Sequence, residues 1–240
     1  MLSTLMSYWR GGNFTMLDIV FLLLSFAVLI FVSLPVHEWA HAFMAHKLGD
    51  DTAKYAGRLT LNPLKHLDTF GTIMMLVCGF GYAKPVPVNA WRFRNPKNGM
   101  ALTSLAGPLS NLAMAILAVG LFRVSCLIFG VQFRDGSMYA SEASIEIMRY
   151  LYVFFIQILA SINISLAVFN LLPIPPLDGS RLFAAVLPDR WSDLMYEYER
   201  YITMGLFVLL LTGALDVPLS FLRRGFGLVV CTLFGMPNVL

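Results

Sequence analysis

The sequence predicts an all-α, multi-pass membrane protein in which a helical bundle carries one re-entrant segment. Hydrophobic residues make up 58% of the 240 residues and charged residues only 13%, whereas about 25% of the residues of a soluble domain are charged. Several apolar stretches reach the roughly 17–25 residues that a membrane-crossing helix needs. We expect one membrane-embedded domain over residues 1–240, in contact with the lipid bilayer. The net charge of +3 suits anionic headgroups and gives no reason to expect nucleic acid.

The length of each apolar stretch predicts whether it crosses the membrane. Residues 17–48 cross with residues to spare, as a retained anchor, and Pro35 is expected to kink this helix. Residues 70–82 are interrupted by glycine and threonine and are too few to cross, so they are predicted to be re-entrant. Crossing length is reached by residues 101–122, 147–172 and 201–222. The short, glycine-rich run 225–239 is expected at the interface or packed on the bundle.

Positive charge on both sides of residues 70–82 predicts the orientation of the protein. Basic residues before this stretch are Lys47, Lys54, Arg58 and Lys65, and those after it are Lys84, Arg92, Arg94 and Lys97. Because positive loops favour the cytoplasm, both flanks should be cytoplasmic, and the ends of stretches 17–48 and 147–172 then meet at one depth. Arg223 and Arg224 fall on the opposite side in this scheme, which we explain only by an interfacial placement.

The string His37-Glu38-Trp39-Ala40-His41 carries the chemistry of the first stretch. Histidines four residues apart lie on one helix face, about 6 Å apart, and can both bind one zinc ion. Glu38 is offset from that face, where it can take a proton from an attacking water. The alternative, polar residues that cap a buried helix, would leave several polar groups in an apolar segment without a partner. The pattern therefore predicts a zinc site inside the membrane.

Catalytic zinc usually has three protein ligands, so a further ligand is expected. Asp178 is the best candidate, because it follows prolines 173, 175 and 176, which break the helix, and precedes Gly179, which permits a tight turn. Irregular backbone at membrane depth is tolerated only where it is buried in protein or lines a watery cavity. The alternative is an ordinary turn aspartate at a helix end.

Two motifs together resemble the site-2 protease family of intramembrane zinc metalloproteases, in its compact form without PDZ or CBS domains. These motifs are H-E-x-x-H, intact at residues 37–41, and N-x-x-P-x-x-x-L-D-G, intact at residues 170–179, and the resemblance extends over segments 58–68, 81–89 and 106–111. It implies that His37, His41 and Asp178 bind zinc, one ion per chain, and that Glu38 is the acid/base. It also implies that Asn170 positions or stabilises the reacting peptide.

Other residues near these motifs allow two interpretations each. His46 is rotated away from the metal face and is expected at the interface, and His66 is expected to bond a backbone carbonyl rather than to replace a ligand. Residues 84–88 alternate like an edge strand that could bind substrate, or form a proline-stiffened loop. Gly107-Pro108 and Asn111 are interpreted as close-packing residues, with contact to the site as the alternative.

The function predicted is hydrolysis of a peptide bond within or near a transmembrane segment of a substrate protein, in regulated intramembrane proteolysis. We expect a prokaryotic cell membrane, with the active site toward the cytoplasm. One rival is a membrane metal transporter that uses His37, His41 and Asp178 as a transit site, but it leaves Glu38 unexplained. A second rival is a silent protein that only binds substrate helices. The physiological substrate and the oligomeric state are not predicted by the sequence.

Overall fold

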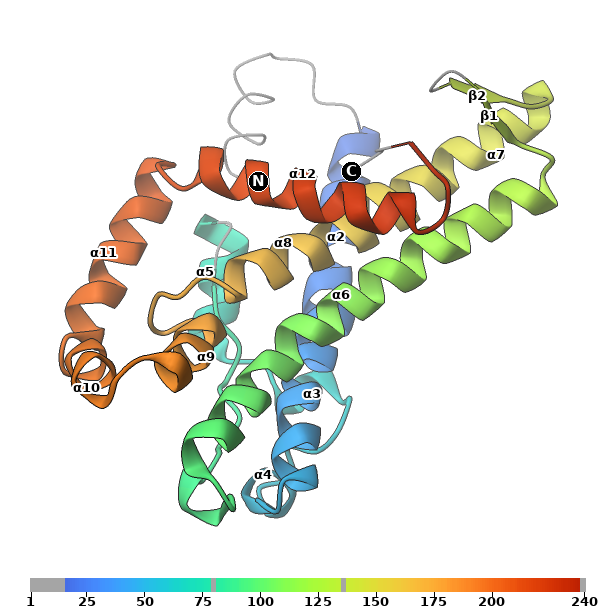
Figure 1. The fold of residues 1–240 in the computed structure, drawn as a ribbon. Coiled ribbons are helices and arrows are strands. Elements are labelled where there is room, and N and C mark those ends of the chain that lie inside the picture. The colour runs from blue at the N-terminus through green and yellow to red at the C-terminus, as the bar shows by residue number, and fades with distance from the viewer. Residues whose placement is uncertain (1–15, 79–80, 135–136, 238–240) are drawn as a thin grey trace.

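The computed structural model describes residues 16–78, 81–134 and 137–237, which are mainly helical (Figure 1). The α-helices are α2 (Met16–Val28), α3 (Leu34–Lys47), α4 (Thr52–Tyr55), α5 (Thr69–Cys78), α6 (Pro96–Ile128), α7 (Glu142–Tyr152), α8 (Ser161–Asn170), α9 (Asp178–Val186), α10 (Asp189–Glu197), α11 (Glu199–Thr212) and α12 (Asp216–Thr232). Two π-helical segments, Leu29–Ser33 and Val153–Ala160, join α2 to α3 and α7 to α8. Single 3-10 turns form at Pro63–Lys65 and Ala90–Arg92, and strands β1 (Gln132–Arg134) and β2 (Ser137–Tyr139) make a small antiparallel pair.

Within the described residues, three helices are long and apolar enough to cross a membrane: Ile19–Lys47, Pro96–Ile128 and Glu142–Asn170. They contain most of the predicted stretches 17–48, 101–122 and 147–172, so these three predictions are confirmed. The first span passes through its π-helical segment just before Pro35, which lacks an N–H to donate and so cannot continue the regular α-helical pattern. An integral membrane protein with three or four spans follows from this arrangement.

Residues 201–222, predicted to be of crossing length, are divided between two helices, which together are long and apolar enough to form a fourth, bent span. Helices α11 and α12 meet at a bend of 86°. Gly213 ends α11 in the left-handed conformation, at φ 71°, while its N–H donates to Leu210 O and that of Ala214 to Leu209 O, the pattern of a Schellman cap. Figure 1 shows α12 running across the bundle, nearly at right angles to α11. The run 225–239 is therefore mostly part of a longer helix that packs on the bundle.

Residues 70–82 double back rather than continuing in one direction. Helix α5 begins at the start of this stretch and runs to Cys78. Gly81 and Tyr82, at the end of the stretch, lie against Gly71 near its start. A Cβ atom at Gly81 would lie 2.1 Å from Gly71 O, and one at Gly71 would lie 2.1 Å from Tyr82 O, so only glycine permits this approach. This close approach agrees with the predicted re-entrant shape of residues 70–82. The depth of the segment in a membrane stays a prediction.

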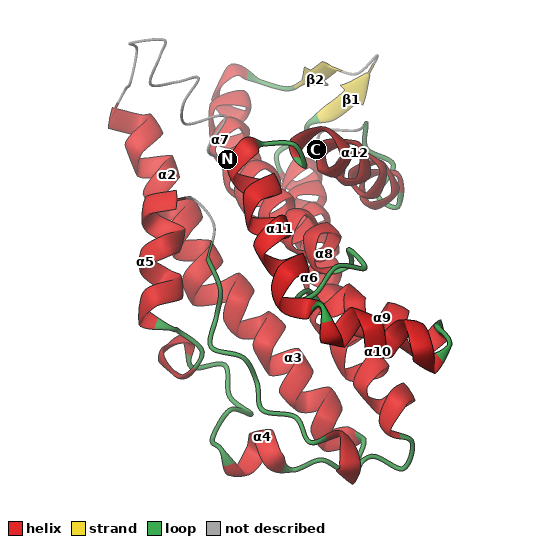
Figure 2. Ribbon diagram, turned by 90° about the vertical axis from the view of Figure 1, so that its left-hand side faces the viewer, coloured by secondary structure: helices red, strands yellow, loops and turns green. Residues whose placement is uncertain are grey.

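The proposed strand at residues 84–88 is not formed, so the loop interpretation holds for this segment. In the described part of the chain, the only strands are β1 and β2, far along the sequence. Residues 81–89 instead run alongside the bundle as an extended loop between α5 and α6 (Figure 2). Its prolines remove backbone donors that a ladder would need.

The bundle core lies where α6 packs against the third span and α12. Phe122 and Ile156 are fully buried there, beside Cys231 of α12. A polar contact joins the first and third spans, because buried Asn163 donates to Ser33 Oγ at 3.1 Å. Interhelical bonds of this kind fix neighbouring helices where water is absent. This packing holds α3, α6 and α8 in register around the site described below.

A buried carboxylate ties the end of α3 to the extended loop. Asp50 is fully buried and accepts hydrogen bonds from Thr52 N at 3.0 Å and from Asn89 N at 2.6 Å. Burial opposes its ionisation, but the hydrogen bonds from Thr52 and Asn89, aided by Arg92, hold the pKa of the Asp50 carboxyl below its ordinary value. The loop before α6 is thus fixed at its far end by one ionised side chain.

We predict that Asp50→Asn lowers the free energy of unfolding at pH 7 by about 1.5–3 kcal/mol, because the buried N–H groups lose a charged acceptor. The folded pKa of Asp50 lies below its unfolded value of about 3.9, so this stabilisation is present above that pH and is lost as pH falls through the folded pKa. Unfolding curves of parent and variant in detergent should therefore converge below about pH 4. The control is Asp193→Asn, an exposed aspartate in α10; an equal effect of both variants would contradict the account.

Candidate metal centre

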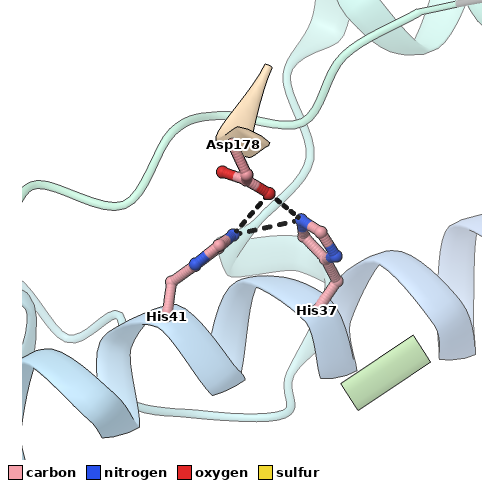
Figure 3. Close-up of side chains that lie close together, drawn as sticks. All are labelled: His37, His41 and Asp178. Carbon is pink, nitrogen blue, oxygen red and sulfur yellow. Dashed lines mark hydrogen bonds and ion pairs between the residues drawn. The ribbon is translucent and has the colours of Figure 1, made fainter. Parts of the chain in front are cut away.

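Three predicted ligands meet at one point between α3 and the start of α9. His37 and His41 project from one side of α3 toward Asp178, the first residue of α9 (Figure 3). The two Nε2 atoms are 3.1 Å apart, and Asp178 Oδ2 lies 3.1 Å from the Nε2 of His37 and 3.2 Å from that of His41. Two ligands at bonds of 2.0–2.1 Å in a tetrahedron are separated by about 3.3 Å. The three atoms therefore already have the spacing that a zinc ion needs.

The Nδ1 atoms of both rings, which face away from Asp178, make hydrogen bonds with helix α6. His41 Nδ1 lies 2.7 Å from Thr103 O, and His37 Nδ1 lies 3.3 Å from Asn111 Oδ1. Both partners can act as acceptors, which assigns the ring protons to Nδ1 and leaves a lone pair on each Nε2. Two lone pairs and a carboxylate oxygen facing one another repel unless a cation lies among them. The donor set of two neutral imidazoles and one carboxylate is one that zinc prefers.

Gly107 of α6 lets the two helices approach closely enough for this geometry. A Cβ atom at this position would lie 2.4 Å from His41 Nε2 and 2.6 Å from His37 Cε1. No side chain fits there without moving the imidazoles. Gly107 and Asn111, interpreted from sequence as packing residues, thus contact the site, which was the alternative interpretation. Gly107 and Asn111 are one helical turn apart, so the sequence already placed them on one face of a helix. It did not say which neighbouring helix that face packs against.

Asp178 is held by the turn that the prolines and Gly179 form. A Cβ atom at Gly179 would lie 2.3 Å from Leu171 O, so the start of α9 packs directly on the end of α8. The Asp178 carboxylate lies against both imidazoles, with its Oδ2 atom 3.1 Å from His37 Nε2 and 3.2 Å from His41 Nε2. Its Oδ2 atom is buried and accepts no hydrogen bond. A buried carboxylate oxygen without a donor fits a metal ligand and does not fit an ordinary turn aspartate.

Glu38 lies on the same helix but outside the cluster of three ligands. It is half-buried and interacts electrostatically with Arg58, a buried residue that is 5% exposed. Arg58 also donates to Lys84 O, and Lys84 N donates to His66 O at 2.8 Å. Arg58 therefore links the acid/base candidate to the extended loop. This link was missed from sequence, since nothing in the spacing of residues 38, 58 and 84 brings them together.

The remaining candidates lie apart from the cluster. Among the described contacts, Asn170 touches none of the three ligands; its Nδ2 donates to Leu166 O of its own helix at 3.0 Å. His66 is buried and bonds Thr60 O at 2.7 Å, which confirms that it is a loop histidine. His46 pairs with Asp51 and is partly exposed, away from the metal face, as expected. The site that the structure assembles therefore consists of His37, His41 and Asp178, with Glu38 beside it.

Comparisons with known proteins agree with this geometry. A family model described as Peptidase family M50 matches residues 25–213. YwhC of Bacillus subtilis (strain 168) is 43% identical over 185 residues, which are 77% of this chain and 79% of YwhC. Rip2 of Mycolicibacterium smegmatis is 30% identical over 77% of this chain and 66% of Rip2. MJ0611 of Methanocaldococcus jannaschii is 28% identical over 72% of this chain and 76% of MJ0611. All three are named as zinc metalloproteases. No solved structure gives a significant match.

We predict that Gly107→Ala removes most of the bound metal, because the new methyl group must displace at least one imidazole. The matched control is Gly205→Ala in α11, where an added Cβ atom meets nothing within 4 Å. The measurement is zinc content of the purified protein, together with helicity by circular dichroism. Full zinc occupancy in a folded Gly107→Ala variant would contradict the close approach of α6 to the ligands.

Proposed function

This chain belongs to peptidase family M50, the site-2 protease family of intramembrane zinc metalloproteases, and from that premise we propose how its residues share the reaction. His37, His41 and Asp178 hold one zinc ion per chain. Glu38 is the general acid/base, and Asn170 positions or stabilises the reacting peptide. The observation that supports this assignment most strongly is the convergence of two Nε2 atoms and one buried carboxylate oxygen within 3.2 Å. Family membership also decides against the metal-transporter interpretation.

A zinc ion at this position would lower the pKa of a water molecule and polarise the scissile carbonyl. Glu38 accepts one proton from the attacking water as the new carbon–oxygen bond forms. It then gives that proton to the amide nitrogen, so that the carbon–nitrogen bond breaks with a neutral amine as the leaving group. Arg58 interacts electrostatically with Glu38 and donates to Lys84 O, so it would hold Glu38 in position beside the extended loop.

Asn170 would act on the developing oxyanion, where an amide donor stabilises negative charge. In this structure one of the two Nδ2 protons is donated to Leu166 O, and the second would be the one offered to the peptide. Asn170 ends α8, and the turn from α8 leads directly to Asp178.

The substrate class that fits this site is a transmembrane segment of another membrane protein. A helical peptide bond is shielded by its own hydrogen bonds and must be unwound before water can attack. The extended loop offers a surface for the unwound chain: within the described backbone, Val86 and Val88 have no backbone hydrogen-bond partner. Their N–H groups alternate with prolines, so an extended substrate could pair along this edge. Substrate binding would then order residues 84–88 as a strand that the free protein lacks.

We place the active site toward the cytoplasm of a prokaryotic cell. The basic residues around α4 and before α6 support this, since α4 and the start of α6 lie at the same end of the bundle as the end of α3 (Figure 2). The similarity to bacterial and archaeal proteins supports a prokaryotic membrane. Residues 1–240 act as a single membrane-embedded unit in this proposal.

The test compares Glu38→Gln and Asp178→Asn with the parent in zinc content and in cleavage of a membrane-protein substrate. Glu38→Gln should keep about one zinc per chain and lose cleavage by at least about 100-fold, the low end of the effect of a general acid/base. Asp178→Asn should lose both, since an amide is a poor zinc ligand. The control is Glu146→Gln in α7, a glutamate outside the cluster.

Two results would contradict the assignment. Cleavage at the parental rate by Glu38→Gln would exclude this residue as the acid/base. Full zinc content in Asp178→Asn, with unchanged cleavage, would exclude Asp178 as the third ligand.

A further inference from the structure

A cavity between α8 and α12 lies apart from the metal centre. It has a volume of about 330 Å³ and is lined by Ser161, Ile164, Ser165, Ser220, Arg223 and Arg224. Helix α12 packs across α8 here, so the cavity is framed by two helices that are distant in sequence (Figure 1). A volume of this size is at the lower end of ligand sites in proteins.

The two arginines in this cavity have no acidic partner. Among the described residues, the ion pairs do not include Arg223 or Arg224. Arg223 Nη1 donates only to Ser165 Oγ, at 3.3 Å. The helices against which α12 packs, α6 and α8, contain no aspartate or glutamate. Arg223 and Arg224 are exposed at the mouth of this cavity, and among the described ion pairs neither positive charge is balanced by an acidic side chain.

The surface beside the cavity is strongly apolar. On α12, Val217 is 78% exposed and Phe221 76% exposed, and Val229, at the far end of the same helix, is 60% exposed. The opposite face of α12 is buried through Gly227, Val230 and Cys231. An exposed apolar surface on a membrane protein is in contact with acyl chains. A ligand of this cavity would meet positive charge and hydroxyl groups at one end and hydrocarbon at the other.

We infer that this cavity binds the phosphate group of an anionic phospholipid. The guanidinium groups of Arg223 and Arg224 match the geometry of phosphate oxygens, and basic pockets between transmembrane helices are known to suit such headgroups. The three serine hydroxyls donate to backbone carbonyls of their own helices, Ile156, Ser161 and Val217, and can turn toward a phosphate oxygen at little cost. Bound lipid would fix α12 on α8 and supply the missing counter-charge.

This site explains the placement of Arg223 and Arg224, which the pattern of basic loops left unexplained. Helix α12 lies across the bundle after the 86° bend, so its arginines need not sit in a loop. The cavity is independent of the metal ligands, and lipid binding there does not rest on the proposed catalytic roles.

The experiment is native mass spectrometry of the full chain in detergent, titrated with phosphatidylglycerol or with phosphatidylcholine. The parent should retain phosphatidylglycerol more strongly. Arg223→Gln and Arg224→Gln should each lower the apparent affinity about fivefold, as expected for one basic residue near a lipid phosphate, and the double variant should lower it more. Arg223→Lys with Arg224→Lys keeps the charge but loses the planar guanidinium groups, so its affinity should fall between those of the parent and the double glutamine variant.

The matched control is Arg149→Gln, which also removes one arginine that lines a cavity. Arg149 lies beside Glu142 and Glu146, so its loss should leave lipid binding unchanged. Parental affinity in a folded double glutamine variant, or equal binding of both lipids, would overturn the inference. Displacement of lipid by inorganic phosphate, but not by potassium chloride of the same ionic strength, would assign the cavity to a soluble anion and would also overturn it.

Discussion

The close contact between α6 and the two imidazoles of α3 is the constraint on which the rest of the site depends. Gly107 leaves room for the rings, while Thr103 O and Asn111 Oδ1 accept the Nδ1 protons. One short stretch of α6 therefore sets both the position of the rings and the nitrogen that faces the metal. Pro108, next to Gly107, cannot donate to a carbonyl one turn earlier, so α6 lacks one backbone hydrogen bond where it meets the site. The third ligand then only has to be brought to a site that α3 and α6 have already formed.

The second set of constraints lies in backbone that is not helical. Asp178 is presented by a turn that Gly179 packs against the end of α8, and the extended loop is held at Lys84 by Arg58 and His66. At the far end of that loop, Asp50 holds Asn89. Irregular backbone near a membrane is stable when its polar groups have partners or face water. Between these fixed ends, Val86 and Val88 have no backbone hydrogen-bond partner among the described residues, which is the feature on which the proposed pairing with substrate rests.

The chemistry of the site was predicted from sequence because it depends on local spacing. The i, i+4 histidines and the proline-rich turn before Asp178 specify ligand type and direction without knowledge of the fold. Asn111 was interpreted first as a packing residue and Arg58 was not assigned a role, because the partner of Asn111 lies 74 residues away and the partners of Arg58 lie on other segments. The division of residues 201–222 between two helices was not predicted, because most of the stretch is apolar, whereas one residue, Gly213, ends α11. Gly213 could have predicted the end of α11, and Asp216 and Pro218 the start of α12. The prediction relied instead on the high hydropathy of the whole stretch.

The central claim is that two imidazole nitrogens and one carboxylate oxygen hold a single zinc ion, and X-ray absorption at the zinc edge of the purified protein tests it most directly. The account predicts two imidazole ligands and light oxygen ligands, all at about 2.0–2.2 Å. A sulfur ligand at about 2.3 Å, or a spectrum that requires three imidazoles, would contradict it.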